Sequence, residues 1–366
     1  MKFSCPREVI LNAVTTTSKA AAVKTTMSAL EGVLLQLSEN TLTVTGYNLE
    51  IGIRTEIAVT GIEDGSTVIN AKMIGDIIRK MPSGEITISC DSSNLATISN
   101  GVTELSVMGM NAGDYPDIPT IDPEKSFAMP QGVIKSMINQ TKYACAMVDT
   151  KPSLMGCKFE VCDNMLNVVA VDGIRIALRK EPCNYDNIEF IVPLKTLEEL
   201  THILTDDNDK NVVFCIDRNQ ISFELEGYTM ISRLIDGEFI QYRKHLSAVG
   251  NNCAEVNCRE IIDMLDRSML VITEKAKCPI RCEFNGDTLS LSCTTALGKI
   301  NDKINIKYNG NPLTVGFNAK YLLDAFKACD TDVAKIMLSD SAVSPIIIVP
   351  TEGDAFTFLL LPMRLK

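Results

Sequence analysis

Three stretches of the chain share one pattern of hydrophobic and polar positions. They read VLLQLSENTLTVTGYNLEIGIR, CKFEVCDNMLNVVAVDGIRIAL and IRCEFNGDTLSLSCTTALGKI, and they begin at Val33, Cys157 and Ile280. Each alternates apolar and polar residues, breaks at a short turn containing Asn, Asp or Gly, and then alternates again. This pattern predicts a β-hairpin. The leucines that follow the three turns are spaced by 124 and 123 residues, which indicates a threefold repeat: Leu42, Leu166 and Leu289.

Two predicted helices keep the same spacing. The first helix of each repeat is predicted by CPREVILNAV, MPQGVIKSMI and CREIIDML, which begin at Cys5, Met129 and Cys258. The second is predicted by NAKMIGDIIRKM, PLKTLEELTHIL and NAKYLLDAFKAC, which begin at Asn70, Pro193 and Asn318. Apolar residues three and four positions apart give each helix one face for a core. A strand-like alternation follows each second helix.

Helices and antiparallel hairpins therefore alternate along the chain, which predicts an α+β fold. We expect three copies of one domain, each with two helices backed by antiparallel sheets. Turn-rich stretches around residues 119–125 and 247–254 separate the copies. The predicted domains are 1–120, 126–247 and 254–366.

The composition is that of a folded globular protein, with 46% hydrophobic and 22% charged residues among 366. The 13 cysteines lack the close pairing of zinc sites, so we expect packed thiols in a reducing compartment and no metal site. The start, MKFSCPREVI, lacks the regions of a signal peptide. The longest apolar runs are well short of the ~20 residues that span a bilayer. We expect a cytoplasmic protein.

Sequence motifs of enzymes are missing. There is no P-loop, no GxGxxG after a strand, no HExxH and no GxSxG elbow. His202 lies in a predicted helix, Asp172 belongs to a turn signal, and TDDNDKN at 205–211 lacks the glycine of a calcium loop. We therefore expect a non-catalytic protein with no catalytic residue and no cofactor. One alternative is an enzyme with a cleft between repeats, which would require a concentrated set of polar residues.

Several short stretches carry a family resemblance through their order and spacing. They are MKF at the start, LTVTGYNLEI at 42–51, AVDGIRIA at 170–177, LIDGEF at 234–239 and PMRL at 362–365. Together with the repeat, they make the chain resemble the beta sliding clamp of bacterial DNA polymerase III over essentially its whole length. The resemblance implies three DNA-clamp (processivity-fold) domains per chain. It also implies a head-to-tail homodimeric ring that encircles duplex DNA and tethers the replicative polymerase and repair partners, with a separate clamp loader.

The net charge of −11 argues against static binding to nucleic acid, because phosphates would be repelled at long range. A ring that is held on DNA by enclosure needs only weak phosphate contacts. The resemblance therefore implies an acidic exterior and a modestly basic lining. The expected DNA-facing residues lie on the helices and their connecting loops: Lys24, Lys72, Arg79, Lys142, Lys151, Lys195, Lys275, Lys277, Lys320 and Lys327.

The chain ends on FLLLPMRLK, although chain ends are usually polar. Pro362 cannot donate to a strand ladder, so we expect the chain to leave its last strand there. Exposed apolar residues at such an exit favour a surface pocket. The resemblance implies a pocket between the second and third domains that receives short peptides of partner proteins. Its expected residues are Val171, Gly173, Ile174, Arg175, Ile176, Ile240, Lys244, His245, Leu359, Leu360, Leu361, Pro362, Met363 and Arg364.

The ring also implies an interface between the first domain of one chain and the third domain of the other. We expect the edge strand carrying Leu105 and Val107 to meet the segment carrying Leu270 and Val271. A further alternative is a triplicated protein-interaction scaffold that does not encircle DNA.

Overall fold

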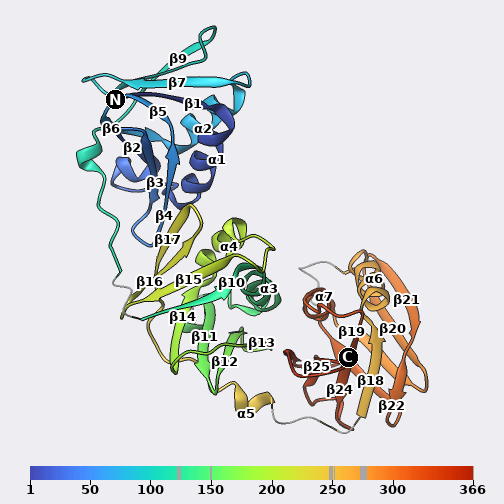
Figure 1. Cartoon of the computed structure of the whole chain (residues 1–366). Helices are drawn as coiled ribbons and strands as arrows, with labels where there is room; N and C mark the ends of the chain where they lie inside the picture. The colour runs from blue at the N-terminus through green and yellow to red at the C-terminus, as the bar shows by residue number, and fades with distance from the viewer. Residues whose placement is uncertain (122–124, 149–150, 247–249, 251, 273–277, 366) are drawn as a thin grey trace. The chain divides into compact units, whose positions relative to one another are not determined.

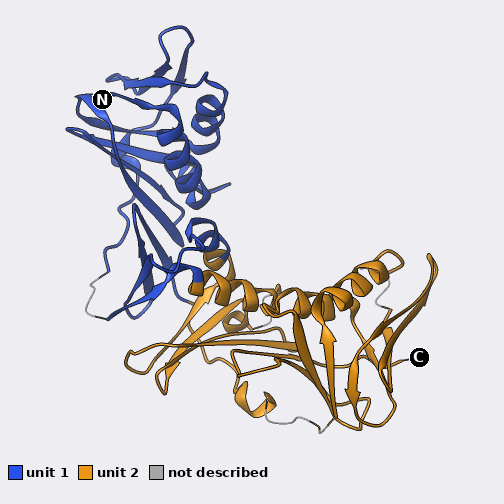
Figure 2. Cartoon of the chain, turned by 45° about the vertical axis from the view of Figure 1, so that its right-hand side comes forward, with its two compact units in different colours: residues 1–132, 198–234 blue, residues 133–197, 235–366 orange. Residues whose placement is uncertain are grey.

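The computed structural model describes residues 1–121, 125–148, 151–246, 250, 252–272 and 278–365 (Figure 1). The chain forms two compact units (Figure 2). Unit 1 contains residues 1–132 and 198–234, and unit 2 contains residues 133–197 and 235–366. Each unit therefore combines strands from two of the three repeats.

Unit 1 contains two antiparallel sheets. The five-stranded sheet has the order β5-β1-β7-β8-β9. These strands are β1 (Lys2–Pro6), β5 (Thr60–Glu63), β7 (Glu85–Cys90), β8 (Leu95–Ser99) and β9 (Glu104–Met108). The eight-stranded sheet has the order β10-β15-β16-β17-β4-β3-β2-β6. Its strands are β2 (Gly32–Ser38), β3 (Thr41–Tyr47), β4 (Ile51–Ala58), β6 (Gly65–Asn70), β10 (Ser126–Pro130), β15 (Asn211–Ile216), β16 (Gln220–Leu225) and β17 (Tyr228–Arg233).

Unit 2 also contains two antiparallel sheets. The nine-stranded sheet has the order β14-β11-β12-β13-β26-β25-β24-β18-β22. These strands are β11 (Gly156–Cys162), β12 (Met165–Val171), β13 (Arg175–Pro182), β14 (Ile188–Pro193), β18 (Asn252–Asn257), β22 (Lys307–Asn309), β24 (Val333–Leu338), β25 (Ile346–Pro350) and β26 (Phe356–Leu360). The four-stranded sheet has the order β21-β20-β19-β23. Its strands are β19 (Ile280–Asn285), β20 (Thr288–Thr295), β21 (Gly298–Asn305) and β23 (Leu313–Phe317).

The six helices of the repeats begin close to the predicted positions, and the short helix Arg243–Leu246 was not predicted. The helices are α1 (Arg7–Thr17), α2 (Ala71–Lys80), α3 (Gln131–Thr141), α4 (Leu194–Ile203), α5 (Arg243–Leu246), α6 (Cys258–Met269) and α7 (Ala319–Lys327). Short 3-10 turns lie at 18–20, 28–31, 112–114, 142–144 and 152–154. An asparagine side chain accepts a hydrogen bond from the first turn of three helices and so caps them: Asn70 for α2, Asn257 for α6 and Asn318 for α7.

The structure confirms the α+β class and the repeat. Strands β4, β13 and β21 are all eight residues long and begin at Ile51, Arg175 and Gly298, which are 124 and 123 residues apart. A first helix follows β1, β10 and β18 directly in the three copies. In the described part of the chain, no helix is long and apolar enough to cross a membrane.

Rows of directly opposed residues relate the copies to one another. In the first copy, Phe3 pairs with Ile88, Ile88 with Ile98, and Ile98 with Leu105. The second row is Phe127, Phe214, Phe223 and Met230, and it continues into the first copy at Ile53. The third row is Ala254, Ile336, Ile348 and Phe358, and it continues into the second copy at Ala177. The last strand of a copy thus pairs with a strand of the preceding copy, except that β9 is an edge.

Candidate partner-binding site

One face of the nine-stranded sheet carries an apolar cluster, all of it within unit 2. Alternation along the strands places Val171 of β12, Ile176 of β13 and Leu359 of β26 on this face. Ile176 lies directly opposite Leu359, which in turn lies opposite Ile347. The buried members of the apolar cluster are Val169, Val171, Ile176, Leu178, Ile191, Phe239, Tyr242, Ile347 and Leu359. Six partly buried residues pack against them: Leu154, Ile235, Ile240, Leu246, Met337 and Val349.

Residues 235–246, which we call the wall segment, cover part of this face. The Ile235 amide donates to the Ile191 carbonyl at 2.9 Å, and the Ser153 hydroxyl donates to the Glu238 carbonyl at 3.0 Å. The wall segment supplies Ile235, Phe239, Ile240, Tyr242 and Leu246 to the cluster. Lys244 and His245 of α5 are exposed. The predicted pocket residues from this segment therefore divide into one apolar member and two exposed basic or polar ones.

The tail, residues 361–365, forms a second border. The Leu361 amide donates to the Ile174 carbonyl at 2.9 Å, and the Met363 amide donates to the Gly316 carbonyl at 2.8 Å. Pro362 lies between these two donors, where its missing N–H costs nothing. A Cβ on Gly316 would lie 2.5 Å from the Met363 carbonyl oxygen, so glycine is needed for this approach. The Leu361 side chain stays 39% exposed beside the apolar cluster.

The remaining predicted tail and turn residues surround this border. Gly173 and Ile174 are exposed in the turn before β13, and Ile174 is 43% exposed. Pro362 and Met363 are half-buried, whereas Arg364 is exposed. A partner approaching the cluster would therefore meet Ile174, Leu361 and Met363 as accessible apolar side chains.

Arg175 and Leu360 point to the opposite face of the sheet, because they alternate with Ile176 and Leu359. The Arg175 guanidinium bonds Asp172 and Asp324, each at 2.8 Å, and the Tyr143 carbonyl at 2.5 Å. It also stacks on Tyr321, 4.2 Å from the ring centroid. Arg175 is thus placed to support the turn at 172–174 from behind, away from the apolar cluster.

Glu160 of β11 forms a polar contact with the wall segment. Its side chain is 12% exposed and accepts hydrogen bonds from the Tyr242 hydroxyl at 2.8 Å and from Lys158 at 3.2 Å. Arg243 also donates to it. Burial raises the pKa of the Glu160 carboxyl, but these three hydrogen bonds outweigh burial and lower the pKa from 4.5 to about 2. The carboxylate therefore stays ionised in mildly acidic solution.

This depressed pKa predicts a pH-dependent contribution to stability. The folded-state pKa lies below 4.5, so the contribution is complete above pH 4.5 and is lost as the pH falls towards about 2. In Glu160→Gln we expect the free energy of unfolding to vary less with pH over this range than in the unchanged protein. Urea unfolding at about pH 5 and about pH 3 measures the difference. Equal pH dependence in both proteins would contradict the assignment.

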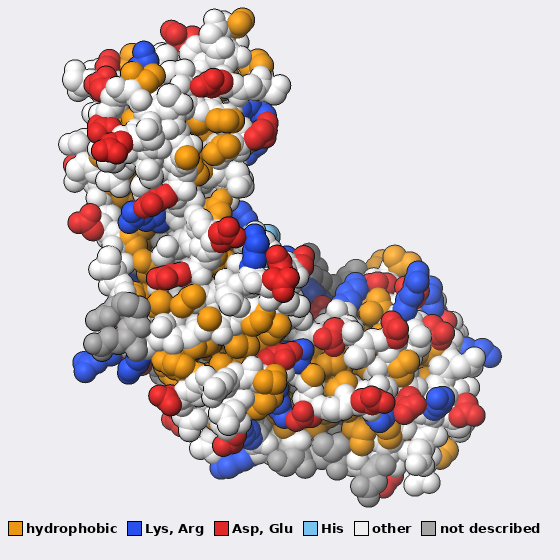
Figure 3. Space-filling model, in the orientation of Figure 1, with side chains coloured by type: hydrophobic (Ala, Val, Ile, Leu, Met, Phe, Trp, Pro, Cys, Tyr) orange, Lys and Arg blue, Asp and Glu red, His pale blue; other side chains and the backbone are white. Residues whose placement is uncertain are grey.

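The predicted DNA-facing residues that the structure describes lie on several helices and loops. Lys24 and Lys151 are exposed in loops, Lys142 is half-buried after α3, and Lys195 is exposed on α4. Arg79 of α2 pairs with Asp76 at 2.8 Å, and Lys327 of α7 pairs with Asp266 of α6 at 3.0 Å. Lys72 and Lys320 are exposed on α2 and α7. Several basic side chains lie over α6 and α7 in Figure 3. Lys275 and Lys277 lie outside the described residues.

The predicted interface residues lie on the edge strand β9 and in the turn that follows α6. Leu105 of β9 is 42% exposed and Val107 is half-buried. Leu270 follows α6 and is 80% exposed. The Val271 carbonyl accepts a hydrogen bond from the Thr295 hydroxyl at 2.6 Å, which holds this segment beside the β20–β21 turn.

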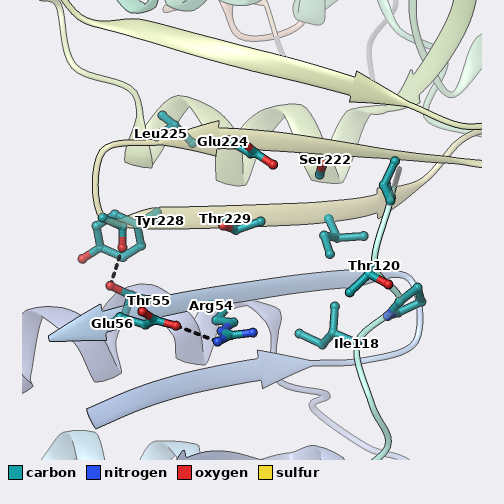
Figure 4. A pocket seen from close by; sticks show the side chains of 14 residues that line it. Arg54, Thr55, Glu56, Ile118, Thr120, Ser222, Glu224, Leu225, Tyr228 and Thr229 are labelled. Atoms are coloured by element: carbon teal, nitrogen blue, oxygen red, sulfur yellow. Dashed lines mark hydrogen bonds and ion pairs between the residues drawn. The ribbon is translucent and has the colours of Figure 1, made fainter. Parts of the chain in front are cut away.

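Unit 1 has a groove of about 420 Å³. The groove lies between strands of the first and second repeats, at the position equivalent to the apolar cluster of unit 2. Its lining includes Arg54, Ser222 and Glu224, where the equivalent residues in unit 2 are Leu178, Ile347 and Val349. Figure 4 shows Ser222 and Glu224 on β16 and Arg54 on β4, with β17 between the two strands and Arg54 paired to Glu56. Burying an apolar peptide against them would leave polar groups without water. The groove of unit 1 and the apolar cluster of unit 2 therefore suit different ligands.

In the part of the chain that the structure describes, no group of three or more His, Cys, Asp or Glu side chains could hold a metal ion. Cys145 and Cys157 lie with their sulfurs 3.6 Å apart, both buried as small apolar side chains.

Part of the site was not predicted from the sequence. Leu154, Ile235, Leu246, Met337 and Val349 join the cluster although they come from four separate segments. Their apolar character signals burial, but only strand pairing places them beside Leu359. Glu160 gave no sequence signal, because its partners lie 82 and 83 residues away.

Comparison with known proteins agrees with this arrangement. The chain matches the DNA polymerase III beta subunit in three parts: the N-terminal domain at residues 1–119, the central domain at 128–241 and the C-terminal domain at 246–364. It is 29% identical to the beta sliding clamp of Halalkalibacterium halodurans, with 100% of both chains covered.

Solved structures give the same result. The crystal structure of a DNA polymerase III beta subunit from Eubacterium rectale is 33% identical and superposes with a TM-score of 0.93 over 99% of each chain. The DNA polymerase sliding clamp of Bacillus subtilis is 26% identical, with a TM-score of 0.94 over 100% of each chain. The protein consists of three clamp domains and belongs to the DNA polymerase III beta subunit family, the family of the beta sliding clamps.

Proposed function

We propose that this sliding clamp works as a homodimeric ring that encircles duplex DNA in the cytoplasm and tethers the replicative polymerase and other partners. The chain has no catalytic role in this proposal and acts as a processivity subunit. The proposed domains are 1–120, 126–247 and 254–366. The observation that supports the ring is that two strands form sheet edges although their counterparts in the other copies are paired on both sides. These strands are β9 in the first copy and β21 in the third.

The repeat supports a specific pairing of these edges. In the rows of opposed residues, Leu105 lies at the place that Met230 and Phe358 hold in the other two copies. Met230 and Phe358 are 0% and 1% exposed, whereas Leu105 is 42% exposed. Ile300 of β21 corresponds to Ile53 and Ala177, which are fully buried, and it is half-buried. Antiparallel pairing of β9 with β21 of a second copy would place Leu105 opposite Ile300. Both strands would then be buried as their counterparts are, and an exposed edge would be removed.

The same register relates the other predicted interface residues. Val107 would lie opposite Gly298, and a Cβ on Gly298 would be 3.5 Å from the Val271 side chain. Val271 and its neighbour Leu270 would therefore border the paired strands. Head-to-tail contacts of this kind close into a ring when two copies complete the rotation.

The number of helices is compatible with enclosure of a duplex. Two long helices in each of six domains make twelve, and packing at ~8–10 Å between axes gives a circle ~30–38 Å across. Subtracting ~10 Å for helix thickness leaves a hole of ~20–28 Å. A B-form duplex fits such a hole without tight phosphate contacts, which agrees with the net charge of −11.

The apolar cluster is the proposed docking site for partner peptides. Accessible side chains of Ile174, Leu361 and Met363 border it, and adaptable apolar surfaces suit several partners that share one site. An extended peptide would bury a few apolar anchors there. Because Arg54, Ser222 and Glu224 line the equivalent groove in unit 1, we propose one such site per chain.

Retention on DNA tests the ring. After loading by the clamp loader of the same organism, the protein should stay on a nicked circle and be lost from the same DNA once it is cut to a linear form. Enclosure predicts this difference because free ends release a ring. A scaffold that binds without encircling DNA would be retained equally on both forms. A block of bound protein at both linear ends should restore retention.

A further inference from the structure

We propose that Glu160 is a positioning residue for partner binding: its carboxylate holds the wall segment against the sheet and so sets the shape of the apolar site. The inference rests on the proposed function of that site. It assigns to Glu160, a residue outside the binding surface, an effect on how the site binds partners. Glu160 lies on β11 and is not a member of the apolar cluster.

The contact geometry supports this role. Tyr242 is 2% exposed, and its ring packs in the apolar cluster while its hydroxyl donates to Glu160 at 2.8 Å. Arg243 donates to the same carboxylate and stacks on the Tyr242 ring, 4.9 Å from the centroid. Charge-assisted hydrogen bonds are about twice as strong as neutral ones. One carboxylate therefore fixes two consecutive residues of the wall segment.

These two residues lie between the members that border the site. Ile240 precedes Tyr242, and Leu246 follows Arg243 at the end of α5; both are partly buried against the cluster. The Tyr242 amide donates to the Ile240 carbonyl at 2.8 Å, and the His245 amide donates to the Tyr242 carbonyl at 3.0 Å. A shift of Tyr242 would therefore move both apolar borders.

The repeat provides an internal comparison. Glu160 corresponds to Gln36 on β2, and Tyr242 and Arg243 correspond to Ile118 and Pro119. None of these three residues can form the charged contact. Unit 1 thus lacks the Glu160 contact at the position where Arg54, Ser222 and Glu224 line its groove. The charged contact occurs beside the apolar cluster of unit 2, which links it to binding rather than to the domain fold in general.

Glu160→Gln is the test variant, and Glu189→Gln is its matched control. Glu189 pairs with the same Lys158, at 2.7 Å, but its side chain is 68% exposed and no hydrogen bond or ion pair of Glu189 to the wall segment is seen in the described residues. Tyr242→Phe is a second variant that keeps the ring and removes only the hydroxyl. Two quantities are measured: hydrogen exchange of the amides at 242, 244 and 245, and affinity for the replicative polymerase of the same organism.

In Glu160→Gln we expect exchange of these amides to rise, and affinity to fall, by about tenfold, with a smaller change of the same sign in Tyr242→Phe. Exchange in α6 and β18 should rise less than exchange of these three amides, because lost stability of unit 2 affects all of its amides whereas release of the wall segment affects only its own. Unchanged affinity in Glu160→Gln, or an equal loss in Glu189→Gln, would overturn the proposal. If the unchanged protein does not bind the polymerase, the proposed function fails, and the exchange data still decide whether Glu160 holds the segment.

Discussion

Removal of residues 361–366 is expected to abolish binding of the replicative polymerase while the dimer persists. The deletion removes the accessible Leu361 and Met363 side chains from the border of the apolar site, and strand β26 still ends intact at Leu360. Loss of central apolar contacts typically costs 2 kcal/mol or more, so affinity should fall by about 30-fold or more. Binding to immobilised clamp, with molecular mass measured in parallel, checks both parts.

A milder variant refines this test. Leu361→Ser keeps the backbone hydrogen bond to Ile174 and removes only the apolar side chain. It should weaken polymerase binding in the same direction with little effect on thermal unfolding, since Leu361 is 39% exposed. Normal binding by the truncated protein would refute the position of the site. A truncated protein that is monomeric would instead assign the tail to assembly.

Leu105→Asp is expected to convert the dimer into a monomer. The proposed pairing buries Leu105 opposite Ile300 of the second copy, where a carboxylate would be desolvated without a partner. The mass in solution should fall from about 80 kDa, two chains of 40.1 kDa, to that of one chain at micromolar concentration. Retention on circular DNA should be lost together with the dimer.

Ile62→Asp is the matched control for this variant. Ile62 is 59% exposed on β5, at the opposite edge of the same five-stranded sheet. The same change in charge at that edge should leave the mass near 80 kDa, because β5 has no role in the proposed pairing. Dissociation by both variants to the same extent would show that Leu105→Asp acts through the stability of the sheet, and the proposed register would then be wrong.

The local pattern of the chain was sufficient for the repeat and its elements. Period-two alternation around short turns predicted the hairpins at β2–β3, β11–β12 and β19–β20, because exposure alternates along a strand that has one buried face. Helix periodicity predicted the helix pairs, and Asn70 and Asn318 lie at their expected starts as caps. The apolar tail and Pro362 predicted where the last strand ends. Each of these features depends on neighbours within a few residues.

The faces of the strands and their distant partners were decided by the tertiary structure. Alternation separates Arg175 from Ile176, but pairing of β13 with β26 determines which of them joins Leu359 in the apolar cluster. Glu160 reaches Tyr242 across 82 residues, and Gly316 receives the tail of a strand in another sheet. The groove of unit 1, with Arg54, Ser222 and Glu224 in its lining, and the apolar site of unit 2 arise from equivalent positions. Such contacts join segments far apart in the chain, so they leave no periodic pattern of apolar and polar residues in the sequence.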